Sequence, residues 1–206
     1  MTSLTSPDLN ALKQHPALAA YAALLKKWQP RINLVGPKTL PEMWVRHFQD
    51  SAQLLPYLPD GPARLVDFGS GAGFPGLVIA CLRPDLDVHL IESDQRKCAF
   101  LRSVAQETGA KVTIHTDRIE SLDSLKADVV TARALASLDK LLTYTQPHLA
   151  ESGFCIFLKG QNVDAELTEA TKCWNFEVET HASETDRAAR VIVLRRLEKQ
   201  GDQDLI

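Results

Sequence analysis

Three glycines that follow a short apolar run have the clearest chemical use in this chain. Gly69, Gly71 and Gly73 come directly after residues 64–68 (RLVDF), and helical spacing begins a few residues later at Pro75. Glycine lets a backbone turn sharply and approach a ligand where a Cβ would block it. A glycine-rich turn between a strand and a helix presents a nucleotide-like ligand to the start of the helix. The segment therefore predicts a site for a nucleotide or nucleoside.

A carboxylate after the next apolar run adds to this site. Glu92 follows residues 88–91 (VHLI), which are typical of a strand. The two oxygens of a carboxylate can accept both hydrogen bonds of a ribose diol. Glu92 is therefore a candidate ribose-binding residue.

Two ligands compete for the glycine turn. Residues 71–76 match G-x-G-x-x-G, the dinucleotide fingerprint, and leave an NAD-dependent dehydrogenase open. Residues 67–73 match D-x-G-x-G-x-G, which resembles the first motif of S-adenosylmethionine (SAM)-dependent methyltransferases. Asp67 favours SAM, because its carboxylate would repel a pyrophosphate but tolerate an ammonium or sulfonium group. A non-catalytic SAM- or nucleotide-binding regulatory module stays open, as does a purely structural turn.

Alternating strands and helices must position these residues. We expect a mostly parallel sheet with helices on both faces. The C-terminal region predicts two further strands without a helix between them, so we expect them to pair antiparallel and close the sheet edge. The predicted strands are 64–68, 87–92, 111–115, 127–132, 154–158, 175–181 and 189–195, and the predicted helices are 75–82, 94–108, 137–149 and 162–171. Residues 197–206 are polar and are expected to fray.

The first 60 residues predict a helical extension. Apolar residues recur at helical spacing over 9–29, with a break at Pro16, and a loop follows. Thr39 resembles an N-cap for a second helix that would run to Leu55. A proline-rich stretch over 57–62 separates this extension, residues 1–60, from a second domain, residues 61–206.

Composition limits the class of protein. The 206 residues are 45% hydrophobic and carry a net charge of −3, which is ordinary for a globular protein. No apolar run reaches the roughly 18 residues of a membrane span, and the N-terminus lacks a signal-peptide pattern. We therefore expect a cytoplasmic protein. The four cysteines are far apart, so we expect neither a metal site nor a disulfide.

Five blocks in order resemble one family, RsmG (GidB). They are residues 28–34 (WQPRINL), 46–51 (RHFQDS), 66–77 (VDFGSGAGFPGL), 131–137 (TARALAS) and 158–160 (LKG). Two departures, Gln29 for the usual Asn and residues 35–36 (VG) for the usual Thr, fall in the N-terminal loop. The resemblance implies an α/β Rossmann-like class I methyltransferase domain over 61–206. It also implies that the protein transfers a methyl group from SAM to guanine N7 in 16S rRNA of the small ribosomal subunit. We expect the enzyme to be a monomer.

The resemblance also implies roles for individual residues. Gly69 and Phe74 would contact SAM, Glu92 would bind its ribose, and Ile119 and Glu120 would lie at its adenine. Arg133 would sit near the methionine end or the target base. The complete set of expected cofactor-binding residues is Asp67, Gly69, Gly71, Phe74, Glu92, Ile119, Glu120 and Arg133. Arg133, Asp50 and Arg46 are the candidates for positioning the substrate, and no residue is assigned as a certain acid–base catalyst.

The chemistry of guanine N7 agrees with the absence of such a catalyst. N7 is an acceptor with a free lone pair and no proton to lose, so its methylation requires no general base. Residues 131–134 (TARA) stand where enzymes that methylate exocyclic amines commonly carry N/D-P-P-Y/F, and no cysteine stands there to attack a pyrimidine. We expect basic residues of the extension to contact RNA phosphates; they are Lys26, Lys27, Arg31, Lys38, Arg46 and His47.

Overall fold

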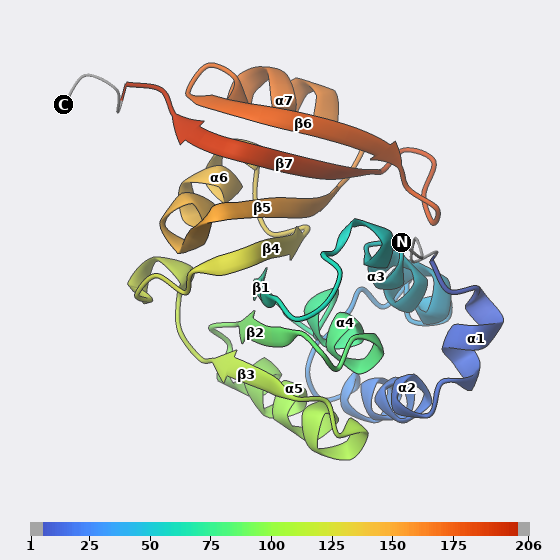
Figure 1. Cartoon of the computed structure of the whole chain (residues 1–206). Helices are drawn as coiled ribbons and strands as arrows, with labels where there is room; N and C mark the ends of the chain where they lie inside the picture. Colours follow the sequence, from blue (N-terminus) through green and yellow to red (C-terminus); the bar gives the residue numbers. More distant parts are fainter. Residues whose placement is uncertain (1–5, 202–206) are drawn as a thin grey trace.

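The computed structural model describes residues 6–201 and contains a seven-stranded sheet (Figure 1). The strand order is β3-β2-β1-β4-β5-β7-β6, in which β1 to β5 run parallel and β7 is antiparallel to both of its neighbours. The strands are β1 Arg64–Phe68, β2 Asp87–Ile91, β3 Val112–His115, β4 Ala127–Arg133, β5 Leu149–Lys159, β6 Trp174–Ala182 and β7 Arg190–Lys199. The predicted α/β sheet with an antiparallel C-terminal pair is confirmed.

Helices cover both faces of this sheet. They are α1 Leu9–Gln14, α2 Pro16–Trp28, a π-helix Trp44–Gln49, α3 Asp50–Ala52, α4 Gly76–Leu82, α5 Gln95–Thr108, α6 Leu138–Thr145 and α7 Val163–Ala170, with 3-10 turns at Leu55–Tyr57, Ile119–Ser121 and Gln146–His148. Alternate residues of β1 face opposite ways, as a strand requires. Leu65 packs in the cluster that contains α2, α4 and α5, whereas Val66 and Phe68 pack with α6 and α7.

The termini of α5 show why this helix forms where the sequence predicts it. Asp94 is its N-cap, and its carboxylate accepts hydrogen bonds from the amides of Arg96 and Lys97. Gly109 ends the helix in the left-handed conformation with φ of 71°, which glycine adopts without steric cost. Both are local signals, and the helix keeps nearly its predicted bounds.

The segment after α2 differs from the expected helix over residues 39–55. The chain makes turns until Met43, and the helical part begins as a π-helix at Trp44. The Thr39 hydroxyl does not cap a helix; it donates to the carbonyl of Gly36 and lies 2.8 Å from Nε2 of His47. The N-cap prediction was wrong because a partner eight residues away takes up this hydroxyl.

Two strands, β5 and β7, extend several residues beyond their predicted ends. β5 begins at Leu149, where it pairs with Ala127 ahead of an irregularity in the ladder, rather than at residue 154. β7 continues to Lys199, which pairs with Trp174, so the fraying predicted from residue 197 is wrong as far as Lys199. The rest of that prediction, residues 202–206, lies outside the described residues.

Helix α2 and the π-helix reach the loop that follows β1 through a group of aromatic rings. Tyr21 stacks on Phe74 with 5.3 Å between ring centroids, and Phe48 meets both rings edge-on. The Tyr21 hydroxyl donates a hydrogen bond to the carbonyl of Ala72 inside this loop. All three rings are buried.

No helix within residues 6–201 has the length and apolar character needed to cross a bilayer.

Candidate active site

The glycine turn follows β1 and bends in the way that the sequence predicts. Gly69 has φ of 62° and Gly73 has φ of 93°, both in the left-handed region that side chains rarely adopt. A Cβ on Gly69 would lie 2.6 Å from Cδ1 of Leu135, which lies across the turn. A Cβ on Gly73 would meet the Tyr21 hydroxyl. Conformation thus favours glycine at both positions, and at Gly73 the close approach of Tyr21 and of Cβ of Leu77, at 2.9 Å, adds to it.

Two adjoining cavities open at this turn, at the carboxyl ends of β1 and β4. The larger has a volume of about 880 Å³ and the smaller about 370 Å³. Both are lined by Gly69, Gly71, Arg133, Ala134 and Leu135. In an open α/β sheet, ligands bind outside the carboxyl ends of the strands where the strand order reverses, and β1 and β4 form this switch point here.

Besides Gly69, Gly71 and Arg133, the smaller cavity is lined by three further predicted cofactor-binding residues, namely Glu92, Ile119 and Glu120. The Glu92 carboxylate accepts hydrogen bonds from the amides of Gly71 and Asp94, at 2.9 and 2.8 Å. These bonds hold the carboxylate against the glycine turn and leave further lone pairs for a ligand. The pKa of Glu120 is lowered, first by its own backbone amide and then by the Tyr144 hydroxyl, so this acid is ionised at neutral pH.

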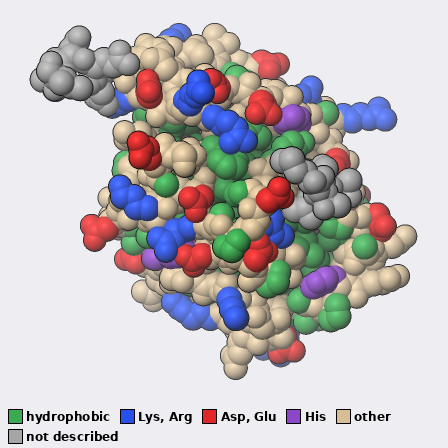
Figure 2. Space-filling view, viewed as in Figure 1, with side chains coloured by type: hydrophobic (Ala, Val, Ile, Leu, Met, Phe, Trp, Pro, Cys, Tyr) green, Lys and Arg blue, Asp and Glu red, His purple; other side chains and the backbone are tan. Residues whose placement is uncertain are grey.

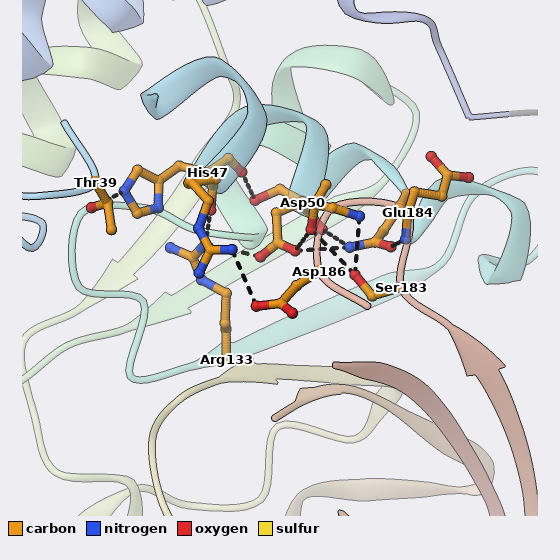
Figure 3. Close-up of polar contacts among 11 residues, drawn as sticks. Thr39, His47, Asp50, Arg133, Ser183, Glu184 and Asp186 are labelled. Carbon is orange, nitrogen blue, oxygen red and sulfur yellow. Dashed lines mark hydrogen bonds and ion pairs between the residues drawn. The ribbon is translucent and has the colours of Figure 1, made fainter. Parts of the chain in front are cut away.

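The larger cavity contains the predicted substrate-positioning residues (Figure 3). Nη1 of Arg133 donates to the carbonyl of Arg46 at 3.0 Å and pairs with the Asp50 carboxylate at 3.1 Å. Its guanidinium lies over the Phe74 ring, 5.1 Å from the centroid. Such cation–π contacts strengthen when the cation is partly desolvated. Arg133 therefore joins β4 to the π-helix and α3.

Asp67 occupies a supporting position behind the turn. It is fully buried, and it is not among the described residues that line either cavity. Oδ1 accepts a hydrogen bond from the Thr131 hydroxyl at 2.8 Å, while Oδ2 finds no partner among residues 6–201. Burial raises the pKa of Asp67 to about 6. Its contact with a ligand stays a prediction, and the geometry favours an indirect role.

His47 differs from the phosphate-docking residue that the sequence suggests. It is buried, stacks on Phe74 with 5.0 Å between ring centroids, and bonds Thr39. Burial lowers the pKa of His47 to about 3, with help from the nearby Arg133 and Arg46 cations, so the ring is neutral at physiological pH. A neutral buried imidazole does not attract phosphates. Lys26, Lys27, Arg31 and Lys38 are exposed, and their role stays a prediction.

Sequence analysis missed three charged residues that line the larger cavity, namely Asp186, Lys159 and Glu166. Asp186 pairs with Arg46 at 3.1 Å, and Lys159 pairs with Glu166 at 2.6 Å. Lys159 also donates to the carbonyl of Ala136, which fixes the segment that carries Leu135. Lys159 stood in a recognised block, so that block was a usable signal. Asp186 had none, because it lies in the turn of the C-terminal hairpin.

Comparisons with known proteins agree with this geometry. The family model described as rRNA small subunit methyltransferase G matches residues 14–193. A protein of that name from Paramagnetospirillum magneticum is 56% identical over 182 residues, covering 88% of each chain. One from Rhodospirillum centenum is 51% identical over 186 residues, covering 90% of this chain and 86% of the relative.

Solved structures show the fold at low identity. A magnesium protoporphyrin IX methyltransferase from Synechocystis with bound SAM has a TM-score of 0.62 and 13% identity, covering 85% of this chain and 97% of that chain. TYW2 of M. jannaschii in complex with AdoMet has a TM-score of 0.58 and 14% identity, covering 82% and 80%. The family expected from the five sequence blocks is confirmed: the chain belongs to the GidB family, rRNA small subunit methyltransferase G.

Proposed function

We propose that this protein transfers the methyl group of SAM to N7 of a guanine in 16S rRNA of the small ribosomal subunit. The observation that carries the proposal is the pair of adjoining cavities that share Gly69, Gly71 and Arg133. One cavity suits a nucleoside, and the other leaves room beside it for a second base. Membership of a methyltransferase family speaks against the dehydrogenase alternative.

The residues present fit SAM. The smaller cavity combines the Glu92 carboxylate, a hydroxyl acceptor, with the apolar side chain of Ile119, which suits the face of an adenine. Gly69 and Gly71 have no side chain that would block a ligand passing between the cavities. Phe74 and Arg133 would hold the methionine end of SAM. Asp67, buried beneath the glycine turn, would support this part of the site indirectly. When bound, SAM supplies a methyl group activated by a positive sulfur.

The chain's own contribution to the reaction is to bind and orient. N7 of guanine needs no base to remove a proton. His47 lines the larger cavity, but its Nε2 already bonds the Thr39 hydroxyl and its ring stacks on Phe74, so we assign it no acid–base role. Holding two reacting atoms about 3–3.5 Å apart supplies much of the rate of such a displacement. The ion pair with Asp50 fixes the orientation of the Arg133 guanidinium in the lining of the larger cavity.

We expect RNA to dock on the outer surface of the N-terminal helices. Basic and acidic side chains lie interspersed over the face of the molecule drawn in Figure 2, so phosphate contacts would come from individual exposed cations. Side chains read N7 poorly inside the deep, narrow major groove of paired RNA, so the target guanine has to be locally unpaired. Lys26 and Lys27, in the last turn of α2, are exposed and available to phosphates. RNA binding that weakens as the salt concentration rises would support these phosphate contacts. The proposal also includes that the enzyme is a monomer and acts in the cytoplasm.

Methyl transfer from labelled SAM to small subunits and to deproteinised 16S rRNA tests the proposal. The product is mapped by borohydride reduction and aniline cleavage, which break the chain at N7-methylguanine. Label at another atom or in another RNA would overturn it. SAM binding without transfer to any RNA would favour a regulatory module instead.

Arg133→Ala separates substrate positioning from cofactor binding. Lost transfer with unchanged SAM affinity by calorimetry assigns Arg133 to the substrate, whereas lost SAM affinity assigns it to the cofactor. Arg196→Ala is the matched control, because Arg196 is an exposed arginine paired with Glu177 on the C-terminal hairpin.

A further inference from the structure

The turn between β6 and β7 brings a carboxylate to the larger cavity. Asp186 lines that cavity, and it lies in a loop that the protein holds in place (Figure 3). The amide of Glu184 donates to the side chain of Gln53 at 2.8 Å, and the Thr185 hydroxyl bonds Asp50. The amide of Ala189 closes the turn on the carbonyl of Asp186 at 3.0 Å. Asp186 is therefore a preorganised group of the cavity.

The Asp186 carboxylate is ionised and accessible. The amide of Ala188 and then the Arg46 guanidinium hold its pKa below the ordinary value. Its side chain keeps 39% of its surface exposed, although Oδ1 accepts from Ala188 and Oδ2 pairs with Arg46. Each carboxylate oxygen can accept a second hydrogen bond, so one acceptor position on each oxygen is left for a ligand.

The other two acids that line the cavity have less to offer a ligand. Asp50 accepts from Arg133, Gln53 and Thr185, and its side chain is 15% exposed. Glu166 pairs with Lys159 and accepts from the amide of Leu138. Among the cavity acids in the described part of the chain, Asp186 is thus the one with the most accessible acceptors.

Two available acceptors on one carboxylate match the Watson–Crick edge of guanine. That edge presents adjacent donors, N1–H and the N2 amino group, whereas adenine presents an acceptor at N1. Unpaired RNA bases are read on this edge. It lies away from N7, so a contact there leaves the methyl acceptor free. Arg46, beside Asp186 and 38% exposed, has donors for O6.

We propose that Asp186 selects guanine by accepting hydrogen bonds from N1–H and N2–H of the target base, with Arg46 donating to O6; this rests on the proposed methylation of guanine N7. Methylation makes the base cationic. A fixed carboxylate at its edge is more favourable in the transition state than in the ground state, which raises the rate as well as the selectivity.

Substrates that differ by one amino group test this assignment. Small subunits are reassembled on ligated 16S rRNA that carries guanosine or inosine at the mapped position. Inosine keeps N7, O6 and N1–H but lacks the N2 amino group. Single-turnover rates are measured for wild type, Asp186→Asn, Asp186→Ala and the control Glu177→Gln, which changes another arginine-paired acid on the same hairpin. Calorimetry with SAM checks that each variant is folded.

Wild type is expected to methylate guanosine about 10- to 100-fold faster than inosine, the effect of one hydrogen bond to a charged group. Asp186→Asn and Asp186→Ala should slow guanosine by more than this factor, because the N1–H bond is weakened together with the N2–H bond, and should slow inosine by the N1–H part alone. The two substrates then become close to equal, with SAM affinity and Glu177→Gln unchanged. A purely structural role for Asp186 would slow both substrates alike.

Three outcomes overturn the assignment of Asp186. They are a wild-type preference near one, variants that keep the wild-type preference, and variants that bind SAM normally and lose nothing. In each of them wild type still methylates N7 of guanosine, so the proposed function stands. If wild type leaves guanosine N7 unmodified, the proposed function fails and the guanine contact fails with it.

Discussion

The buried carboxyl of Asp67 should make the stability of this protein depend on pH in an unusual direction. Its pKa is raised from 3.8 to about 6, because burial penalises the charged form. The native state therefore binds a proton more tightly than the unfolded chain does. This group's contribution to stability is complete below pH of about 4 and is lost as the pH rises through about 6.

The magnitude follows from the size of the shift. A difference of about two pKa units, at about 1.4 kcal/mol per unit, corresponds to about 3 kcal/mol of unfolding free energy. The substitution Asp67→Asn keeps the shape of the side chain and the acceptor for the Thr131 hydroxyl, and it removes the titration. The unfolding free energy of wild type minus that of the variant should fall by about 2.5 kcal/mol between pH 4 and pH 8, because the unfolded carboxyl is already partly ionised at pH 4.

Urea denaturation followed by circular dichroism, repeated at half-unit pH steps, measures this difference. Asp87→Asn is the control of opposite sign. Desolvation alone would raise the pKa of Asp87, but Arg64 and His89 outweigh it and lower that pKa, so its stabilisation is lost on acidification. A difference for Asp67→Asn that is flat with pH, or that rises with pH, would refute the assignment of a raised pKa.

Three further variants test the supports of the turn and the cavity. Tyr21→Phe leaves the Ala72 carbonyl without its donor and should cost about 1–3 kcal/mol of stability in urea titrations, with weaker SAM binding by calorimetry. Gly76→Ala places a Cβ 2.6 Å from Cβ of Asp67, so overpacking of about 1–3 kcal/mol should lower the midpoint of thermal unfolding by roughly 2–12 °C. His47→Gln removes a group with a native pKa of about 3, so melting temperatures should fall less steeply than in wild type between pH 6.5 and 4; an unchanged slope would contradict the buried neutral ring.

The elements nearest the glycine turn could be predicted from sequence because their signals are local. The strand at residues 64–68 was predicted with its observed bounds, and α4 begins at Gly76, one residue after the predicted start. Apolar runs, a proline and glycines with positive φ act within a few residues of themselves. Glu92 was also found this way, since it directly follows a strand.

The remaining features depend on partners distant in sequence. Thr39 looked like a helix cap but bonds His47, and no local pattern announces that contact. Asp186 lies in the turn between β6 and β7. Because β7 pairs with β5 in the sheet, this turn comes to lie beside the π-helix, where Asp186 pairs with Arg46. Asp67 was correctly placed at the end of β1, but the fact that it faces Thr131 behind the turn follows from the register of β1 on β4.

The hydrogen bond from Tyr21 to Ala72 means that the glycine motif alone does not contain everything that holds its conformation. The donor lies 51 positions before its acceptor, on a helix that the motif itself does not include. A chimera that carried residues 64–82 into another parallel sheet would contain the glycine turn but would lack the Tyr21 hydroxyl that donates to it. Conversely, a substitution in α2 that removes this phenol would change the support of the turn while every glycine stays in place.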